Sequence, residues 1–174
     1  MVKLHLGCGK KYINGWINID QASGVADELI DLRRFLPYSD NSVDFIFNEH
    51  FIEHLTRREA FMFLKECYRV LSYKGVLRIS TPDLEYLITK YKEKDLTEWN
   101  DERWFPMSAC QMMNEGMTDW GHKFLYDYEE LYSVLELVGF SKITLEKYKE
   151  SKNPELRDLE SRFYHKELIA EAVK

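Results

Sequence analysis

The stretch Lys3-Leu4-His5-Leu6-Gly7-Cys8-Gly9 decides the fold. Its short apolar run ends in glycines, which is typical of a first strand followed by a sharp turn. Glycine lets the backbone turn tightly and approach a ligand without a Cβ in the way. A second apolar stretch, Trp16 to Asp20, ends in an acid. Because open α/β sheets bind ligands at the carboxyl ends of their strands, the turn and Asp20 predict a nucleoside site in which the acid accepts the ribose hydroxyls.

Length and composition predict one globular domain with one core. The chain has 174 residues, 45% of them hydrophobic and 31% charged. Its apolar runs are far shorter than the roughly 20 residues of a membrane span, and we expect neither a membrane partner nor a secretory signal. The net charge of -6 argues against a nucleic-acid partner. Three widely spaced cysteines predict a cytoplasmic protein without disulfides or a zinc site, so we expect no metal.

Short apolar runs alternate with helical patterns, which predicts an α/β fold with a largely parallel sheet. Three helices are expected to begin at the capping residues Thr56, Asp83 and Asp127. The first two strand-to-strand connections are too short for a helix, since a parallel crossover normally needs a dozen or more residues. We therefore expect simple turns there. The expected strands cover residues 4–6, 16–20, 28–31, 43–47, 76–81, 143–148 and 167–173.

Residues from about 92 to 126 show no strong periodicity. A stretch of this length inside a compact domain is usually a functional loop or lid. A covering loop whose aromatic residues fill the edge of the core is an alternative of equal weight. Within a single domain spanning residues 1–174, we expect residues 92–126 to be an insertion that forms part of an acceptor site. The segment is rich in large side chains, including Trp99, Trp104, Trp120, Met107, Met112, Met113 and Met117.

The glycine turn does not fit a dinucleotide or a triphosphate. A dinucleotide-binding turn has a third glycine where this chain has Tyr12, and its acid follows about 20 residues later, so Asp20 comes too early. No Gly-Lys-Ser/Thr sequence of a P-loop is present. A ligand with a ribose but no pyrophosphate avoids both objections, and S-adenosylmethionine is such a ligand.

Taken in order, these motifs resemble the class I S-adenosylmethionine-dependent methyltransferases, of the small prokaryotic type, over nearly the whole chain. The resemblance implies a Rossmann-like, doubly wound sheet of about seven mostly parallel strands with the last strand antiparallel. It also implies S-adenosylmethionine as the cofactor. The matching segments are 4–9, Asp20, 31–44, 47–55, 68–77, 122–127 and 135–140.

The resemblance also predicts the cofactor site. The glycine turn would approach the cofactor, Asp20 would bind the ribose, and Asp31 would contact the adenine. Cys8 is expected to be a small filler of the turn. The full predicted set is Gly7, Cys8, Gly9, Asp20, Gln21, Asp31, Leu32, Asn48 and Glu49.

Two positions depart from the family pattern. His5 stands where the family usually has an acid that holds the amino group of the cofactor, and Lys11 lies near the usual third glycine. Lys10 or Lys11 could reach the carboxylate of the cofactor, but two solvated turn lysines are the favoured interpretation.

The predicted reaction is methyl transfer to a small-molecule acceptor, for which the protein mainly aligns the reactants. A general base helps when the acceptor is a hydroxyl. His50, His54 and His122 are the candidate catalytic residues, with Asp83 and Glu49 behind them, and we choose His50 and His122. Each histidine is nevertheless more often a positioning residue.

Three other functions stay open at this point. A cofactor-binding subunit without catalysis, or one that depends on a partner, is favoured by His5 and the short early connections. A nicotinamide-dependent oxidoreductase is disfavoured by Tyr12. A nucleic-acid methyltransferase is disfavoured by the acidic charge.

Overall fold

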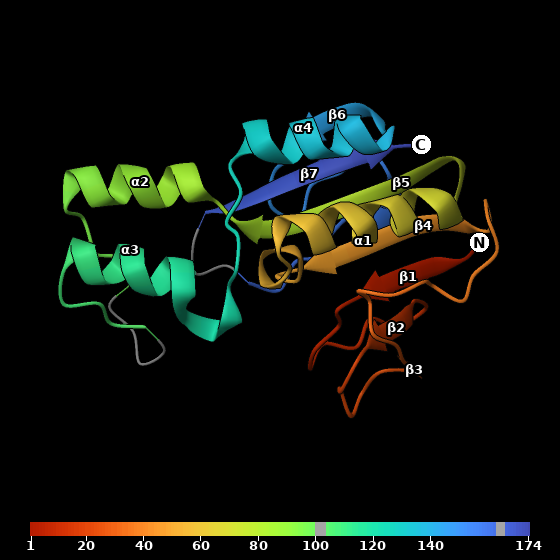
Figure 1. Cartoon of the computed structure of the whole chain (residues 1–174), viewed down its shortest axis with the longest axis horizontal. Helices are drawn as coiled ribbons and strands as arrows, with labels where there is room; N and C mark the ends of the chain where they lie inside the picture. Colours follow the sequence, from red (N-terminus) through yellow and green to blue (C-terminus); the bar gives the residue numbers. More distant parts are fainter. Residues whose placement is uncertain (100–103, 163–165) are drawn as a thin grey trace.

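The computed structural model describes residues 1–99, 104–162 and 166–174, and these form a seven-stranded sheet in the order β3-β2-β1-β4-β5-β7-β6 (Figure 1). Neighbouring strands from β3 to β5 are parallel, and β7 runs antiparallel to both β5 and β6. The predicted sheet is therefore confirmed, including the reversed last strand. The strands are β1 (Lys3–Leu6), β2 (Ile17–Asp20), β3 (Glu28–Leu29), β4 (Val43–Glu49), β5 (Leu71–Pro82), β6 (Ser141–Leu145) and β7 (Glu167–Val173).

The predicted helix starts are confirmed by their caps. Thr56 and Glu59 form a complete capping box at α1, and the side chains of Asp83 and Asp127 accept backbone amides at the starts of α2 and α4. The helices are α1 (Arg57–Val70), α2 (Leu84–Glu93), α3 (Ala109–Thr118) and α4 (Tyr128–Val138), with 3-10 turns η1 (Ile52–His54), η2 (Asp119–Gly121) and η3 (Pro154–Leu156).

Several boundaries differ from the sequence prediction. The largest shift is at β5, which begins at Leu71, directly after α1, instead of at residue 76. The strand expected at 143–148 is β6, which pairs with β7 from Ser141 to Leu145, directly after Gly139 ends α4. The backbone carbonyl of Lys147 then accepts a hydrogen bond from Arg78 instead of continuing the ladder. The segment without periodicity contains a helix, α3, whose Met112 is fully buried against α2. As expected, turns without helices join β1 to β2 and β2 to β3.

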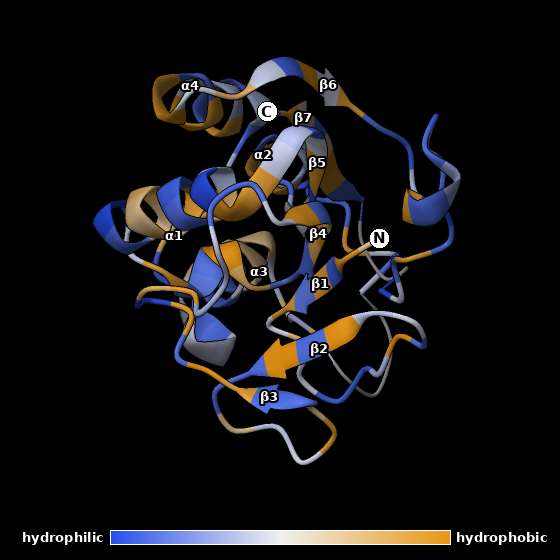
Figure 2. Cartoon of the chain, turned by 90° about the vertical axis from the view of Figure 1, so that its right-hand side faces the viewer, coloured by the Kyte–Doolittle hydropathy of each residue, from blue (hydrophilic) through white to orange (hydrophobic). Residues whose placement is uncertain are grey.

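The two faces of the sheet are covered differently. Helices α1 and α4 pack on one face, where Leu4, Ile46 and Leu77 contribute to the main core. In Figure 2 these helices lie to the left of the sheet. The opposite face is covered by loop segments, and its smaller core gathers around Phe47 and Leu156. Within the described residues, this second face carries a 3-10 turn but no α-helix.

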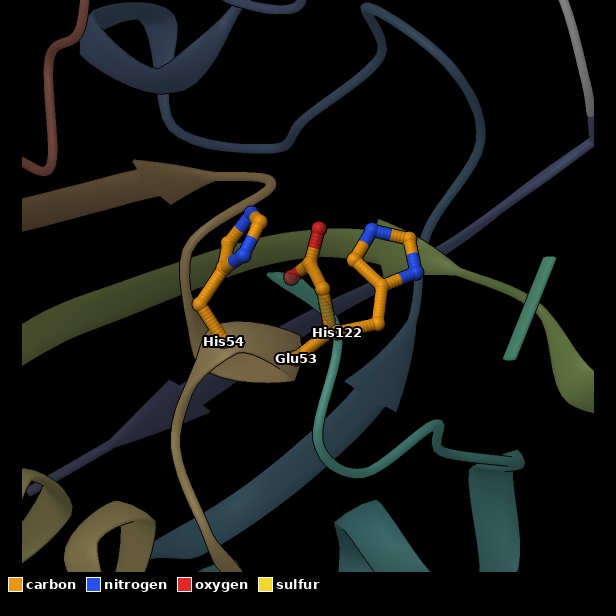
Figure 3. Close-up of side chains that lie close together, drawn as sticks. All are labelled: Glu53, His54 and His122. Carbon is orange, nitrogen blue, oxygen red and sulfur yellow. The ribbon is translucent and has the colours of Figure 1, made fainter. Parts of the chain in front are cut away.

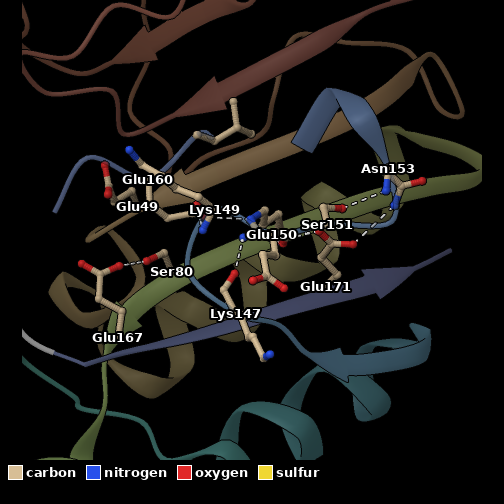
Figure 4. Close-up of polar contacts among 12 residues, drawn as sticks. Glu49, Ser80, Lys147, Lys149, Glu150, Ser151, Asn153, Glu160, Glu167 and Glu171 are labelled. Atoms are coloured by element: carbon tan, nitrogen blue, oxygen red, sulfur yellow. Dashed lines mark hydrogen bonds and ion pairs between the residues drawn. The ribbon is translucent and has the colours of Figure 1, made fainter. Parts of the chain in front are cut away.

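Buried charge also distinguishes the loop-covered face. Arg78 on β5 is fully buried and forms ion pairs with Glu160 at 2.5 Å and with Glu171 at 2.6 Å. Figure 4 shows Glu160 and Glu171 together with the segment from Lys147 to Asn153 that lies across β5 and β7. A buried charge is tolerated only when it is paired and hydrogen-bonded, so these contacts hold the loop segment on the sheet.

Helices α2 and α3 lie beyond the end of the sheet at which β5 finishes (Figure 1). They form a small separate core in which Leu87, Trp99, Met112 and Leu125 are buried. This arrangement carries the middle segment past the carboxyl ends of the strands, where the cavities described below open. Over the described ranges, no helix is long and apolar enough to cross a membrane.

Candidate functional site

A cavity of about 690 Å³ opens at the carboxyl ends of β1, β2 and β4. The structure brings eight of the nine predicted cofactor residues to its wall, which are Gly7, Cys8, Gly9, Asp20, Gln21, Asp31, Leu32 and Glu49. The exception is Asn48, which does not line the cavity. Its side chain is fully buried, and neither polar atom has a hydrogen-bond partner in the part of the chain that is described.

The glycine turn is shaped by a close contact behind it. Gly7 has a φ of 73°, and a Cβ at this position would lie 2.7 Å from the ring of Phe51. The backbone amides of Gly7 and Cys8 both donate to the carbonyl of Ile19, at 2.9 and 3.1 Å, which fixes the turn against β2. Gly9, with a φ of 53°, has open space where its Cβ would be. The turn therefore needs Gly7 for packing and leaves the surface at Gly9 free for a ligand.

Asp20 is held in one orientation at the rim of this cavity. Its Oδ2 accepts the backbone amide of Gly9 at 3.0 Å, and its Oδ1 accepts that of Ala22, also at 3.0 Å. A carboxylate oxygen can accept two hydrogen bonds, so each oxygen keeps capacity for a ligand hydroxyl.

Asp31 lies on the opposite wall, two residues beyond the end of β3. Arg33 contacts both of its carboxylate oxygens, at 2.8 and 2.9 Å, and these hydrogen bonds lower the pKa of Asp31 to about 2. The group is therefore an anion and an acceptor at neutral pH. Next to it, Leu32 is only 3% exposed and supplies an apolar wall.

Glu49, at the end of β4, is a second fixed carboxylate in the cavity wall. It accepts hydrogen bonds from the backbone amide and the hydroxyl of Ser161, both at 2.6 Å, and from the amide of Arg162 at 3.0 Å. Burial alone would raise its pKa, but these hydrogen bonds and the charge of Lys11 lower it. Glu49 is thus ionised although its side chain is only 5% exposed.

His5 and Lys11, the two positions that depart from the pattern of the resembled family, are both partly or fully buried. His5 is 1% exposed, stacks on Phe47 with ring centroids 5.3 Å apart, and burial lowers its pKa to about 4, so it is neutral. The interpretation of Lys11 as a solvated turn lysine is wrong. Its ammonium group lies 3.5 Å from Glu49 and donates to the carbonyl of Leu159. Lys10 is exposed on the cavity wall.

His50 is held as a cation, which argues against its predicted role as a general base. Its backbone is left-handed, with a φ of 51°, and its ring lies between Glu53, 3.2 Å from Nδ1, and Glu167, 2.8 Å from Nε2. Burial alone would lower the pKa of His50, but the two carboxylates raise it to about 9. A protonated imidazole has no lone pair with which to accept a proton.

His122 lies in a second cavity of about 350 Å³. Its Nδ1 is 2.8 Å from the carbonyl oxygen of Gly116, so Nδ1 carries the hydrogen and Nε2 keeps its lone pair. Burial lowers the pKa of His122, which keeps the ring neutral. Aromatic side chains from α2 and the middle segment line the same cavity, namely Tyr86, Trp104 and Trp120.

The two cavities adjoin, because His50, His54 and Arg162 line both. His54 also lies beside His122, with ring centroids 5.1 Å apart (Figure 3). His54 is one of the three candidate histidines from the sequence, but no sequence pattern indicated Arg162. The latter follows a loop that returns to Glu49 through long-range hydrogen bonds, for which no local sequence signal exists.

Comparison with known proteins agrees with this geometry. Residues 21–79 match a family model described as a methyltransferase domain. A search of curated proteins finds no match.

Solved structures show the same fold. An S-adenosylmethionine-dependent methyltransferase from Archaeoglobus fulgidus is 18% identical with a TM-score of 0.63, and the match covers 99% of this chain and 85% of that one. One from Mesorhizobium loti is 16% identical with a TM-score of 0.61, covering 99% and 90%. A third structure is a complex between the Haloferax volcanii Trm112 methyltransferase activator and a protein that its description calls the putative methyltransferase. It is 13% identical with a TM-score of 0.60, and the match covers 99% of this chain and 81% of that one.

Proposed function

We propose that this protein, which has a methyltransferase domain in the class I fold, transfers a methyl group from S-adenosylmethionine to a small molecule. The observation that supports this best is the pair of adjoining cavities. The larger one has the glycine turn and the fixed carboxylates of Asp20 and Asp31, and the smaller one is lined by aromatic side chains. Their shared wall at His50 and His54 is where a donor and an acceptor would meet.

The residues of the larger cavity suit the cofactor. Asp20 would accept the ribose hydroxyls, because its two oxygens are already oriented by Gly9 and Ala22. Asp31 would accept the adenine amino group beside the apolar wall of Leu32. Glu49 would hold the amino group of the methionine end, which compensates for the neutral His5 in place of an acid. When bound, the cofactor supplies a methyl group on a positively charged sulfur.

The smaller cavity suits an acceptor with an aromatic or other flat apolar part. Trp104 and Trp120 lie edge to face, with ring centroids 5.2 Å apart, and form one wall. The carboxylates of Asp83 and Glu167 supply polar contacts on the other side. In this proposal, residues 104–122, which belong to the insertion expected at 92–126, form part of the wall of the acceptor site.

A proton leaving the acceptor would go to His122. Its Nε2 has a free lone pair and its pKa is lowered, so the ring is neutral and able to accept. His50 would act as a fixed cation that positions Glu53 and Glu167, not as the base.

The proposal is tested by transfer of labelled methyl from S-adenosylmethionine to a panel of small phenols and amines. We expect His122→Gln to lower kcat on hydroxyl acceptors. Trp120→Ala should raise the KM of the acceptor and leave the affinity for S-adenosylhomocysteine unchanged. Binding of S-adenosylhomocysteine without turnover on any acceptor would reject catalysis by the isolated chain.

That outcome would favour the second candidate, an activity that depends on a partner protein. Its support is the Haloferax volcanii structure, in which a methyltransferase of the same fold is in complex with an activator. Repeating the transfer assay with a co-purified partner would then decide between an inactive subunit and an activated enzyme.

A further inference from the structure

We propose that Glu53, His54 and His122 bind one divalent transition-metal ion, with Zn²⁺ the best match, at the boundary between the two cavities. Each residue offers one ligand atom, and the three atoms lie within 4.8 Å of one another. Figure 3 shows the carboxylate of Glu53 between the two imidazole rings. Small side-chain rotations would bring these atoms to the metal–ligand distances of about 2.0–2.2 Å that zinc requires.

The backbone fixes the three residues relative to one another. Glu53 and His54 are adjacent in η1, directly after β4. The carbonyl of Glu53 accepts the backbone amides of Lys123 at 2.8 Å and Phe124 at 3.2 Å, which places His122 beside η1. His122 follows η2 in a stretch without secondary structure, and these two hydrogen bonds hold that stretch against η1.

His122 has a nitrogen lone pair available for a metal. The hydrogen bond from Nδ1 of His122 to the carbonyl of Gly116 leaves Nε2 as a lone-pair donor. Metal-bound histidines usually donate their second ring nitrogen to a carbonyl or carboxylate in this manner, which fixes the tautomer and the orientation of the ring.

Glu53 provides the observation that points most directly to a cation. Its side chain is fully buried, and Oε2 accepts a 3.0 Å hydrogen bond from the hydroxyl of Thr81. Oε1 forms an ion pair with Nδ1 of His50 at 3.2 Å but accepts no hydrogen bond among the described residues. A metal at Oε1 would satisfy this oxygen, while His50 would keep its hydrogen bond to Glu167.

The ligand set determines the kind of metal and its use. Two imidazole nitrogens and one carboxylate favour Zn²⁺ or a similar ion over Mg²⁺ and Ca²⁺, which prefer oxygen ligands. Three protein ligands leave a coordination position open, as in catalytic zinc sites. Because His54 and His122 line the acceptor cavity, that position would face an acceptor hydroxyl and lower its pKa. This role rests on the proposed function, whereas metal binding itself does not. With Nε2 of His122 bound to the metal, His122 could not act as the base, and the proton of the acceptor hydroxyl would leave to solvent.

The test is titration of the metal-free full-length chain with Co²⁺, followed by visible absorption, and with Zn²⁺ in competition. We expect binding of one ion per chain with a dissociation constant in the micromolar range or tighter. Removing one ligand in His54→Gln or His122→Gln should weaken binding by about tenfold or more. Cys110→Ser, which removes an exposed thiol outside the site, should bind as the wild type does.

Circular dichroism and cooperative thermal unfolding of the same preparations show that they are folded. The metal result is thus separate from the binding of S-adenosylhomocysteine and from the proposed function. The metal proposal is overturned if the folded wild type binds only at millimolar Co²⁺ and Zn²⁺. It is also overturned if both His54→Gln and His122→Gln bind these ions as tightly as the wild type.

Discussion

The backbone amide of Lys123 donates a hydrogen bond of 2.8 Å to the carbonyl oxygen of Glu53. This bond ties the end of the aromatic middle segment to the turn after β4. As a result, His122 lies next to His54, and the smaller cavity shares a wall with the cavity of the glycine turn. The proposed reaction depends on this junction, because methyl transfer requires the two reactants in direct contact.

Replacing Gly7 with alanine should destabilise the fold. The new Cβ would lie 2.7 Å from the ring of Phe51, and the φ of 73° is unfavourable for alanine. We expect Gly7→Ala to lower the free energy of unfolding by about 1–3 kcal/mol in urea titration. Gly24→Ala is the matched control, since nothing lies within 4 Å of its Cβ position. An equal effect in both variants would contradict the packing argument.

Arg78→Met should be strongly destabilising. The change leaves Glu160 and Glu171, both buried, without their cation. Breaking a buried ion pair by removing one partner costs about 3–5 kcal/mol. Arg57→Met removes an ion pair to Glu130 that is mostly exposed and should cost no more than about 1 kcal/mol. If thermal or urea unfolding ranks the two variants in the opposite order, the loop-covered face is not held as described.

The stability of the chain should depend on the titration of His5. Burial lowers the pKa of this residue from 6.5 to about 4 in the folded state, so the unfolded chain takes up the proton first as the pH falls. The contribution of His5 is therefore fully present above pH 6.5 and is lost between pH 6.5 and 4, by about 3 kcal/mol. His5→Asn should show a smaller loss of unfolding free energy over the same range. Parallel curves for the two proteins would show that His5 is not buried in its neutral form.

Glu49→Gln should weaken binding of the methionine end of the cofactor and spare the nucleoside end. We expect the affinity for S-adenosylhomocysteine to fall about tenfold, because a hydrogen bond between charged groups is lost. The affinity for 5′-methylthioadenosine, which lacks the amino and carboxylate groups, should not change. Calorimetry that finds the two ligands weakened equally would mean that Glu49 maintains the shape of the cavity and does not bind the amino group.

Features set by local sequence could be predicted, whereas those set by distant partners could not. The strand at Leu4 to Leu6 and the cap at Thr56 follow from neighbouring residues, and both are confirmed. Helix α3 was missed because only Ala109, Met112 and Gly116 of its ten residues are buried, and the helix packs on α2, which lies far away in the chain.

The protonation state of His50 depends on Glu167, and the position of Lys11 depends on Glu49, both far away in the chain. For the same reason, the sequence indicated most of the residues that line the larger cavity but not the shared wall between the two cavities.

Calorimetric titration of the purified chain with S-adenosylhomocysteine, alongside the variant Asp20→Ala, tests the proposed cofactor site. Asp20 lines the larger cavity with both oxygens oriented by backbone amides, so its removal should abolish ribose recognition. We predict one bound molecule per wild-type chain and a loss of binding in the variant. No binding by the folded wild type, or unchanged binding by Asp20→Ala, would contradict the proposed cofactor site.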